Sequence, residues 1–132
     1  MPPALPLQGV RQWRTIPGEC ANGVPRVMRF VETPIFTRAI LEQLSEDDYR
    51  RLQLALLLRP EQGALIRSSR GLRKLRWAAT GRGKRSGLRV IYYWHAAEHV
   101  IYMLYAYPKN AQENLTPGQL RMLCRLVKEG FR

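Results

Sequence analysis

The chain has 132 residues, of which 45% are apolar, and a formal net charge of +12, so it is long enough for one domain with a substantial hydrophobic core. It has no apolar run of about 18 residues, as a membrane-spanning helix needs, and its start lacks the basic and apolar segments of a signal peptide. We therefore expect a cytoplasmic protein whose partner is nucleic acid or an acidic protein.

Proline and glycine are frequent in residues 1–27, which contain five prolines and three glycines and show no sustained hydrophobic period. Such a composition buries too little apolar surface to order a chain on its own. We predict a disordered or extended leader over residues 1–27 and a compact domain over residues 28–132. Met28 is the expected natural start if the leader arises from an upstream start codon.

One strand and two helices are expected next. The apolar stretch 28–32 predicts a strand, and the Thr-Pro pair at 33–34 is typical of a helix start. Apolar residues at helical spacing extend this helix to Leu44. Ser45 and the three acids behind it predict the start of a second helix, which ends before Pro60.

A β-hairpin is predicted in the second half of the chain. Residues 72–78 alternate aliphatic and basic side chains, residues 80–87 form a loop with several glycines, and residues 88–94 are rich in β-branched and aromatic residues. Residues 64–66 could add a brief strand before this hairpin, beyond the four main strands. A strand that is apolar on both faces follows at 100–107, and we expect it to be central, with helices on one side and aromatic packing or a ligand on the other.

Thr116 and Pro117 predict the start of a final helix that ends near Gly130. The expected element order is β-α-α-β-β-β-α. This order predicts an α+β fold with two N-terminal helices and one C-terminal helix around a small sheet.

Positive charge is concentrated in the hairpin. Residues 71–90 hold seven Arg or Lys and no acid, whereas residues 28–70 hold seven basic and six acidic residues. Strand alternation puts Lys74 and Arg76 on one face and Arg73 on the other. Because unpaired like charges oppose folding, we interpret this cluster as a site for a polyanion rather than as a solvated surface.

Arginine and lysine side chains can promote cleavage of RNA, because the ribose 2′-hydroxyl supplies the nucleophile from within the substrate. The protein then has to orient the attack, move protons and stabilise the charge on phosphorus. Arg89 begins the second hairpin strand beside the basic face of the first, where its guanidinium can hold two phosphate oxygens. The alternative for Arg89 is a structural ion pair with a carboxylate.

Other chemistries lack their residues in this sequence. His95 to His99 spells HxxEH, but this zinc pattern works only on a helix, and the residues lie between two predicted strands. Neither a catalytic pair of carboxylates nor a Ser-His-Asp order stands out, and the glycine-rich nucleotide motifs are absent, so we expect neither a metal nor a cofactor. Cys20 and Cys124 are expected to be free thiols.

Several short motifs occur in an order that resembles a known family. They are GLRKLR at 71–76, a Gly/Lys/Arg loop, SGLRVIYY at 86–93, YAYPKN at 105–110 and LTP at 115–117. Over residues 28–130 the chain resembles the RelE/HigB toxins of bacterial toxin-antitoxin pairs, and most closely the HigB-type members. The resemblance implies a curved, mainly antiparallel sheet backed by helices.

The same resemblance implies cleavage of messenger RNA in the ribosomal A site. It implies a cognate antitoxin, HigA-like, whose helix-turn-helix domain would provide the contact with operator DNA. It places the catalytic residues at Lys74, Arg76, Arg89 and Lys109. Arg76 stands where the family has a lysine and stays charged, so Lys74 is the first candidate for proton transfer. The aromatic residue that RelE members place near the C-terminus has no match in residues 108–119.

The basic residues around the predicted loop are expected to contact RNA without taking part in the chemistry. These are Arg73, Arg82, Lys84 and Arg85.

Two other functions remain open. A ParE-like toxin would share the fold and poison DNA gyrase by binding, and it would need no basic catalytic cluster. A non-catalytic RNA-binding module would use Tyr92, Tyr93, Tyr102 and Tyr105 as stacking platforms, although tyrosines in strands more often belong to the core.

Overall fold

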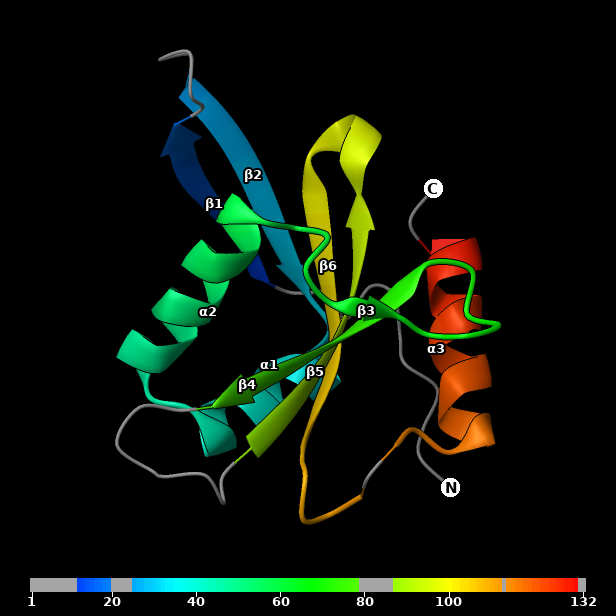
Figure 1. Ribbon diagram of the computed structural model, residues 1–132. Coiled ribbons are helices and arrows are strands. Elements are labelled where there is room, and N and C mark those ends of the chain that lie inside the picture. The colour runs from blue at the N-terminus through cyan, green and yellow to red at the C-terminus, as the bar shows by residue number, and fades with distance from the viewer. Residues whose placement is uncertain (1–11, 20–24, 79–86, 113, 131–132) are drawn as a thin grey trace.

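The structure is a computed structural model that describes residues 12–19, 25–78, 87–112 and 114–130 (Figure 1). It contains one six-stranded sheet and three α-helices. The strands are β1 (Gln12–Glu19), β2 (Pro25–Glu32), β3 (Ala64–Leu65), β4 (Leu72–Ala78), β5 (Gly87–His95) and β6 (Val100–Pro108). The helices are α1 (Pro34–Gln43), α2 (Glu46–Leu58) and α3 (Pro117–Gly130).

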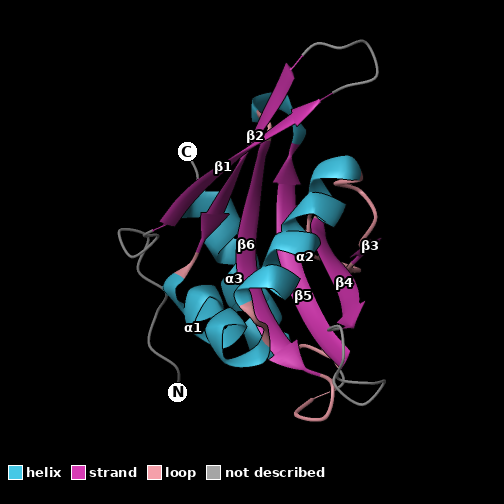
Figure 2. Ribbon diagram, turned by 90° about the vertical axis from the view of Figure 1, so that its left-hand side faces the viewer, coloured by secondary structure: helices cyan, strands magenta, loops and turns pink. Residues whose placement is uncertain are grey.

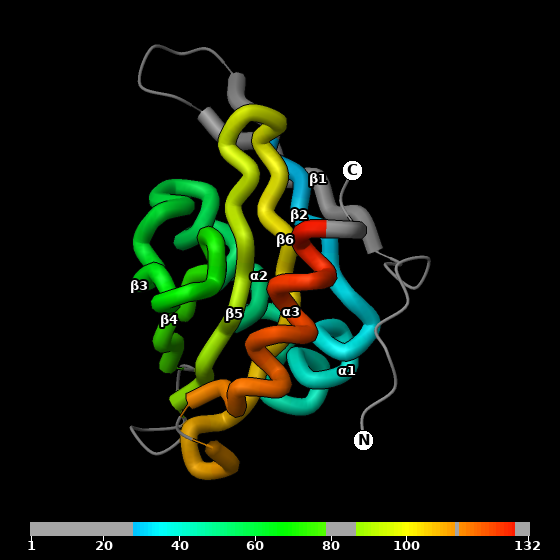
Figure 3. The backbone as a smooth tube through the Cα atoms, turned by 90° about the vertical axis from the view of Figure 1, so that its right-hand side faces the viewer, coloured from blue at the N-terminus to red at the C-terminus, as the bar shows by residue number. Residues whose placement is uncertain are grey.

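The sheet is mainly antiparallel, with the strand order β1-β2-β6-β5-β4-β3. The pairing of β2 with β6 is parallel, and it joins Arg29–Glu32 to Val100–Met103. Helices α1 and α2 cover one face of the sheet and α3 covers the other (Figures 2 and 3). The predicted α+β class, with two N-terminal helices and one C-terminal helix, is confirmed.

Each helix begins where its capping residue predicts. The hydroxyls of Thr33 and Ser45 accept hydrogen bonds from the backbone N–H of the residue three positions later, at 3.1 Å in both cases. Thr116 accepts from the backbone N–H of Gln119 in the same way, at 3.1 Å. These bonds satisfy backbone donors that the first helical turn leaves free. Because Ser and Thr supply such bonds, the helix starts can be predicted from the sequence.

Two apolar clusters fill the two faces of the sheet. The cluster under α1 and α2 includes Phe30, Phe36, Leu52 and Tyr92. The cluster under α3 is smaller and contains six buried residues. Its members are Leu72, Ile91, Leu104, Tyr107, Leu123 and Leu126.

Strand β6 is central, as predicted, because it lies between β2 and β5. The sequence predicts helices on one side of this strand and aromatic packing or a ligand on the other. In the structure helices lie on both sides, since Leu123 and Leu126 of α3 pack in the same cluster as Leu104 of β6. The brief strand expected before the hairpin is present as β3.

The first strands differ from the sequence-based expectation. Residues Gln12–Glu19 form β1, which pairs along its whole length with β2, and β2 itself begins at Pro25 rather than at Met28. Pairing with an existing strand supplies hydrogen-bond partners that composition alone does not reveal. Part of the predicted leader is therefore an edge strand of the sheet. Among the described residues, no helix has the length and apolar character required to cross a membrane.

Candidate active site

Four of the predicted site residues gather on the face of the sheet that α3 covers in part. We call Lys74, Arg76, Arg89 and Lys109 the cationic cluster. Arg76 of β4 lies directly opposite Arg89 of β5 in the antiparallel register, and Arg89 lies opposite Tyr107 of β6. Cross-strand partners point to the same face and lie about 5 Å apart. Two arginines and a tyrosine thus form a row across three strands.

Arg89 is the most enclosed member of the cluster, with 5% of its surface exposed. Its Nε is buried and has no hydrogen-bond partner among the described residues. A buried guanidinium nitrogen without a partner is costly, because it has lost water and has gained nothing in exchange. The guanidinium of Arg89 therefore has donor capacity that no described residue uses at Nε, and a guanidinium can bind phosphate oxygens.

Lys74 lies two residues before Arg76 on the same face of β4, opposite Ile91. Its Nζ donates a hydrogen bond of 2.7 Å to Oδ1 of Asn114, which precedes α3. This bond to a neutral amide oxygen positions the ammonium and leaves its charge uncompensated. Sequence reasoning missed Asn114, whose contact with Lys74 spans 40 residues.

Lys109 joins the cluster from the end of β6. Its backbone N–H donates to the carbonyl of Gly87 at 2.9 Å, which holds the two strand ends together. A Cβ placed on Gly87 would lie 3.5 Å from Nη1 of Arg89 and 3.8 Å from Cβ of Lys109. The side chains of Arg89 and Lys109 therefore meet above this glycine, whose missing side chain leaves them room.

Among the described residues, Arg73 is the predicted RNA contact, and it lies apart from the cationic cluster. Arg73 points to the opposite face of β4, where its Nη1 donates to the carbonyl oxygens of Glu61 at 2.8 Å and Gly63 at 2.7 Å. These bonds pin the turn between α2 and β3 to the sheet, so Arg73 does not belong to the cationic cluster. Its contact with RNA stays a prediction. The predictions for Arg82, Lys84 and Arg85 lie outside the described residues.

No carboxylate neutralises the cationic cluster within the part of the chain that the structure describes. Two ion pairs of the described residues lie on and beside α2, between Arg51 and Asp48 and between Arg59 and Glu61. Like charges directly opposite each other on a sheet are destabilising. The direct opposition of Arg76 and Arg89 therefore costs stability, and an anion bound between them would remove that cost.

The remaining motifs take structural places. The His95–His99 segment forms a 3₁₀ turn rather than an α-helix, with His99 at a φ of 57°. Over the described ranges, no three His, Cys, Asp or Glu side chains form a group that could hold a metal ion. Tyr92 belongs to the core, where its hydroxyl donates to the carbonyl of Pro60 at 2.6 Å and accepts from the N–H of Gly63 at 2.9 Å. Tyr93 and Tyr102 are half-buried and stack on each other at 6.3 Å between ring centroids.

The cationic cluster has the composition of an oxyanion site. Arginine offers paired N–H donors that match phosphate oxygens, and Lys74 adds a group able to exchange protons. Such an arrangement stabilises negative charge that grows during attack on a phosphodiester.

Comparison with known families agrees with this picture. A family model described as "RelE toxin of RelE / RelB toxin-antitoxin system" matches residues 59–131, which is more than half of the chain. The match covers β3 to β6 and all of α3, and it includes every member of the cationic cluster.

Proposed function

This chain belongs to the RelE family of toxins from toxin-antitoxin systems, and from that membership we propose that it is a ribosome-dependent endoribonuclease that cleaves messenger RNA and stops translation. The observation that supports the proposal most directly is the pair of opposed arginines, Arg76 and Arg89, on one face of the sheet. Two arginines in direct opposition repel each other, so they add nothing to the stability of the sheet. An anion that accepts hydrogen bonds from both of them is the partner that suits them. A ribosomal site of action would place the protein in the cytoplasm.

The proposed reaction uses the substrate's own nucleophile and needs no metal or cofactor. The ribose 2′-oxygen forms a bond to phosphorus and the bond from phosphorus to the 5′-oxygen breaks. This leaves a 2′,3′-cyclic phosphate and a 5′-hydroxyl. Arg76 and Arg89 hold the non-bridging oxygens, whose charge grows in the transition state. Lys109 adds positive charge from the end of β6.

Two protons move in this reaction, one from the 2′-hydroxyl and one to the departing 5′-oxygen. Lys74 is the proposed proton-transfer group, since the arginines keep their protons. Its bond to Asn114 fixes the position of Nζ. If Lys74→Ala cleaves at the wild-type rate, proton transfer belongs to another group, such as one on the ribosome.

The test is incubation of the purified toxin with translating ribosomes and an end-labelled message. We expect cuts at codon spacing, with 2′,3′-cyclic phosphate ends, and no cuts in free message. Arg50→Ala is the matched control for Lys74→Ala and should cleave like wild type, because Arg50 is an exposed cation on α2 outside the cluster. Breaks in DNA through gyrase would instead indicate a ParE-like toxin, and binding without cleavage would indicate a non-catalytic RNA-binding module.

We also propose that Arg82, Lys84 and Arg85 dock the toxin on ribosomal RNA. Removing one cation that binds a phosphate should lower the slope of log affinity against log salt by about one. The triple alanine variant should therefore bind ribosomes more weakly at all salt concentrations and show a flatter salt dependence. An unchanged slope would remove these residues from the docking surface.

The partner of a toxin from such a system is its antitoxin. We propose a HigA-like antitoxin with a helix-turn-helix domain, so that operator DNA is bound through the antitoxin. Co-expression of the toxin with the product of the adjacent gene tests this, because a stable complex should form and cell growth should recover. An adjacent gene product without a DNA-binding helix pair would contradict the HigA-like assignment.

A further inference from the structure

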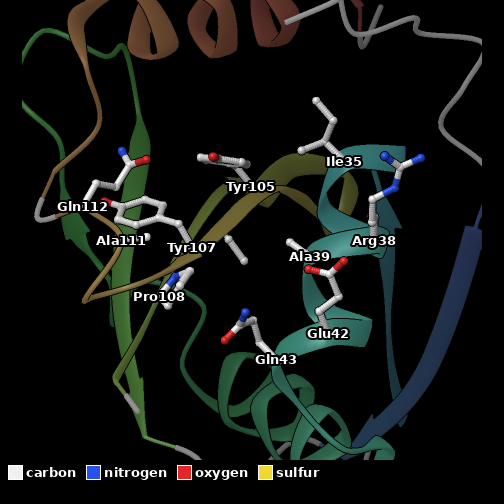
Figure 4. A pocket seen from close by; sticks show the side chains of 11 residues that line it. Ile35, Arg38, Ala39, Glu42, Gln43, Tyr105, Tyr107, Pro108, Ala111 and Gln112 are labelled. Carbon is white, nitrogen blue, oxygen red and sulfur yellow. The ribbon is translucent and has the colours of Figure 1, made fainter. Parts of the chain in front are cut away.

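A pocket of about 280 Å³ lies at the edge of β6, between that strand and α1 (Figure 4). It forms here because β2 pairs only with the first four residues of β6, so the strand's second half has α1 beside it. Two hydrogen bonds fix this arrangement, from Thr33 N–H to the carbonyl of Met103 at 3.1 Å and from Thr33 Oγ1 to that of Leu104 at 2.8 Å. The pocket is thus built into the fold.

The pocket adjoins the cationic cluster through Tyr107. This residue lines the pocket and is also the cross-strand partner of Arg89. Neighbouring strands lie about 4.8 Å apart, so the pocket begins one strand away from the proposed phosphate site. A nucleotide whose phosphate contacts Arg89 has its base within reach of this pocket.

The pocket walls combine aromatic and apolar surface with a few polar groups. Tyr105 and Tyr107 form one side, with ring centroids 5.6 Å apart. Ile35 and Ala39 of α1 face them across the pocket, and Pro108 lies at one end (Figure 4). Tyr107 is buried, at 2% exposure, so the half-buried ring of Tyr105 is the aromatic surface on which a nucleobase can stack.

One polar group of the lining is held in a defined orientation. The side-chain amide nitrogen of Gln112 donates to the backbone carbonyl of Asn114 at 2.8 Å and to Oε1 of Gln119 at 2.9 Å. Both of its N–H donors are therefore used, and its carbonyl oxygen is left as an acceptor. Gln119 in turn lies 3.5 Å from the hydroxyl of Tyr105, which links this network to the aromatic wall. Glu42 adds a second acceptor at the rim.

We propose that this pocket binds a nucleobase of the message next to the scissile phosphate, and that it favours bases with an exocyclic amino group over uracil. The inference rests on the proposed function, because it takes the ligand of the cationic cluster to be RNA. The acceptors of Gln112 and Glu42 match an amino group, which uracil lacks. The volume of about 280 Å³ is slightly below that of typical ligand pockets, which hold about 300–1,000 Å³, so the pocket suits a single base.

The pocket is tested on the full chain by NMR titration with short 2′-O-methyl oligonucleotides, which cannot be cleaved. An all-adenine trimer should shift the methyl signals of Ala39 and Ala111 and should bind more tightly than an all-uracil trimer. Ala39→Phe fills the pocket and should weaken binding of the adenine trimer about tenfold or more, as expected when one base no longer stacks. Leu41→Phe is the matched control, because Leu41 lies on the same helix with 73% of its surface exposed and outside the pocket.

A second variant keeps the inference testable if Ala39→Phe does not fold. Gln112→Leu alters a loop outside the core and removes one of the two acceptors, so it should bind the adenine trimer with a smaller preference over the uracil trimer than wild type shows. Shifts that avoid the pocket, or affinities equal to wild type in both variants, would overturn the inference. If wild type cleaves message on ribosomes yet both variants keep its base preference, only the pocket fails. If wild type binds trimers in the pocket and cleaves nothing, only the proposed catalysis fails.

Discussion

Arg73 and Arg89 lie on neighbouring strands, yet they belong to opposite faces of the sheet and have opposite surroundings. Arg73 has two backbone carbonyls as partners and holds a turn in place. Arg89 is buried, faces another arginine and leaves its Nε without a partner among the described residues. The comparison teaches that the partners of an arginine, rather than its residue type, distinguish one that holds a turn in place from one whose Nε no described residue uses.

The largest expected effect comes from removing the charge of Arg89. Arg89→Met keeps most of the side-chain volume and should lower cleavage on ribosomes about 10²–10³-fold, as loss of one oxyanion donor does. The free energy of unfolding should stay equal or rise, because a buried cation opposite Arg76 disappears. Single-turnover cleavage and denaturant unfolding measure the two quantities.

Arg73→Met is the counterpart of that change. It should lower the free energy of unfolding, because the carbonyls of Glu61 and Gly63 lose their donor. The single-turnover rate at saturating toxin should stay unchanged, because the RNA contact predicted for Arg73 would affect binding and not the chemical step. If Arg73→Met abolishes cleavage while Arg89→Met does not, the assignment of the two faces is wrong.

The α1/α2 face has a buried acidic side chain, Glu32, whose hydrogen-bond partners lie within the fold. Glu32 is 0% exposed and accepts hydrogen bonds from the hydroxyls of Thr37, at 2.8 Å, and of Tyr49. Glu32→Ala leaves both hydroxyls without this acceptor and should lower the free energy of unfolding by about 3 kcal/mol. Urea denaturation measures it, and a decrease below about 1 kcal/mol would show that the carboxylate is not needed for this packing.

A smaller decrease is expected from Tyr92, whose hydroxyl bridges Pro60 and Gly63. Tyr92→Phe keeps the ring in the core and removes both hydrogen bonds, so the free energy of unfolding should fall by about 1–3 kcal/mol. Tyr93→Phe serves as the control, since Tyr93 is only half-buried. Equal stability in the two variants would show that the Tyr92 bridge contributes nothing.

The smallest effect concerns Cys124, on the α3 side of the sheet. Burial raises the pKa of its thiol, while the nearby Arg70 lowers it by less. A raised pKa keeps the thiol protonated at neutral pH, and only the thiolate reacts. In a Cys20→Ser background, iodoacetamide should therefore modify Cys124 more slowly than a free thiol, and the rate should reach that of the free thiol only at higher pH. Faster reaction than free cysteine at pH 7 would contradict this.

The sequence predicts the parts of this structure that depend on local rules. The helix starts at Thr33, Ser45 and Thr116 follow from capping, and the shared face of Lys74 and Arg76 follows from strand alternation. The family model confirms the resemblance to RelE toxins. The direct opposition of Arg76 and Arg89 cannot be predicted in the same way. It depends on the register of the two hairpin strands, and the sequence of the loop does not determine that register.

Contacts between distant segments were beyond sequence analysis. Strand β1 was missed because its order comes from pairing with β2 rather than from its own composition. Asn114 and Tyr107 are far from Lys74 and Arg89 in the sequence, and only the folded structure brings them to the cationic cluster. The irregular pairing of β5 with β6 at Ile91 and Tyr92 shifts the register there. A β-bulge of this kind changes which residues of β6 share a face, and alternation alone gives no sign of it.

The opposition of Arg76 and Arg89 links the folding equilibrium to the ions in solution. An anion that binds only the folded chain stabilises it by mass action, by about 2.7 kcal/mol at a hundred times its dissociation constant. We therefore expect the melting temperature to climb with phosphate or sulfate more steeply in wild type than in Arg89→Met. On the proposed function, the two charges that hold the RNA phosphate also make the protein without a bound anion its least stable form.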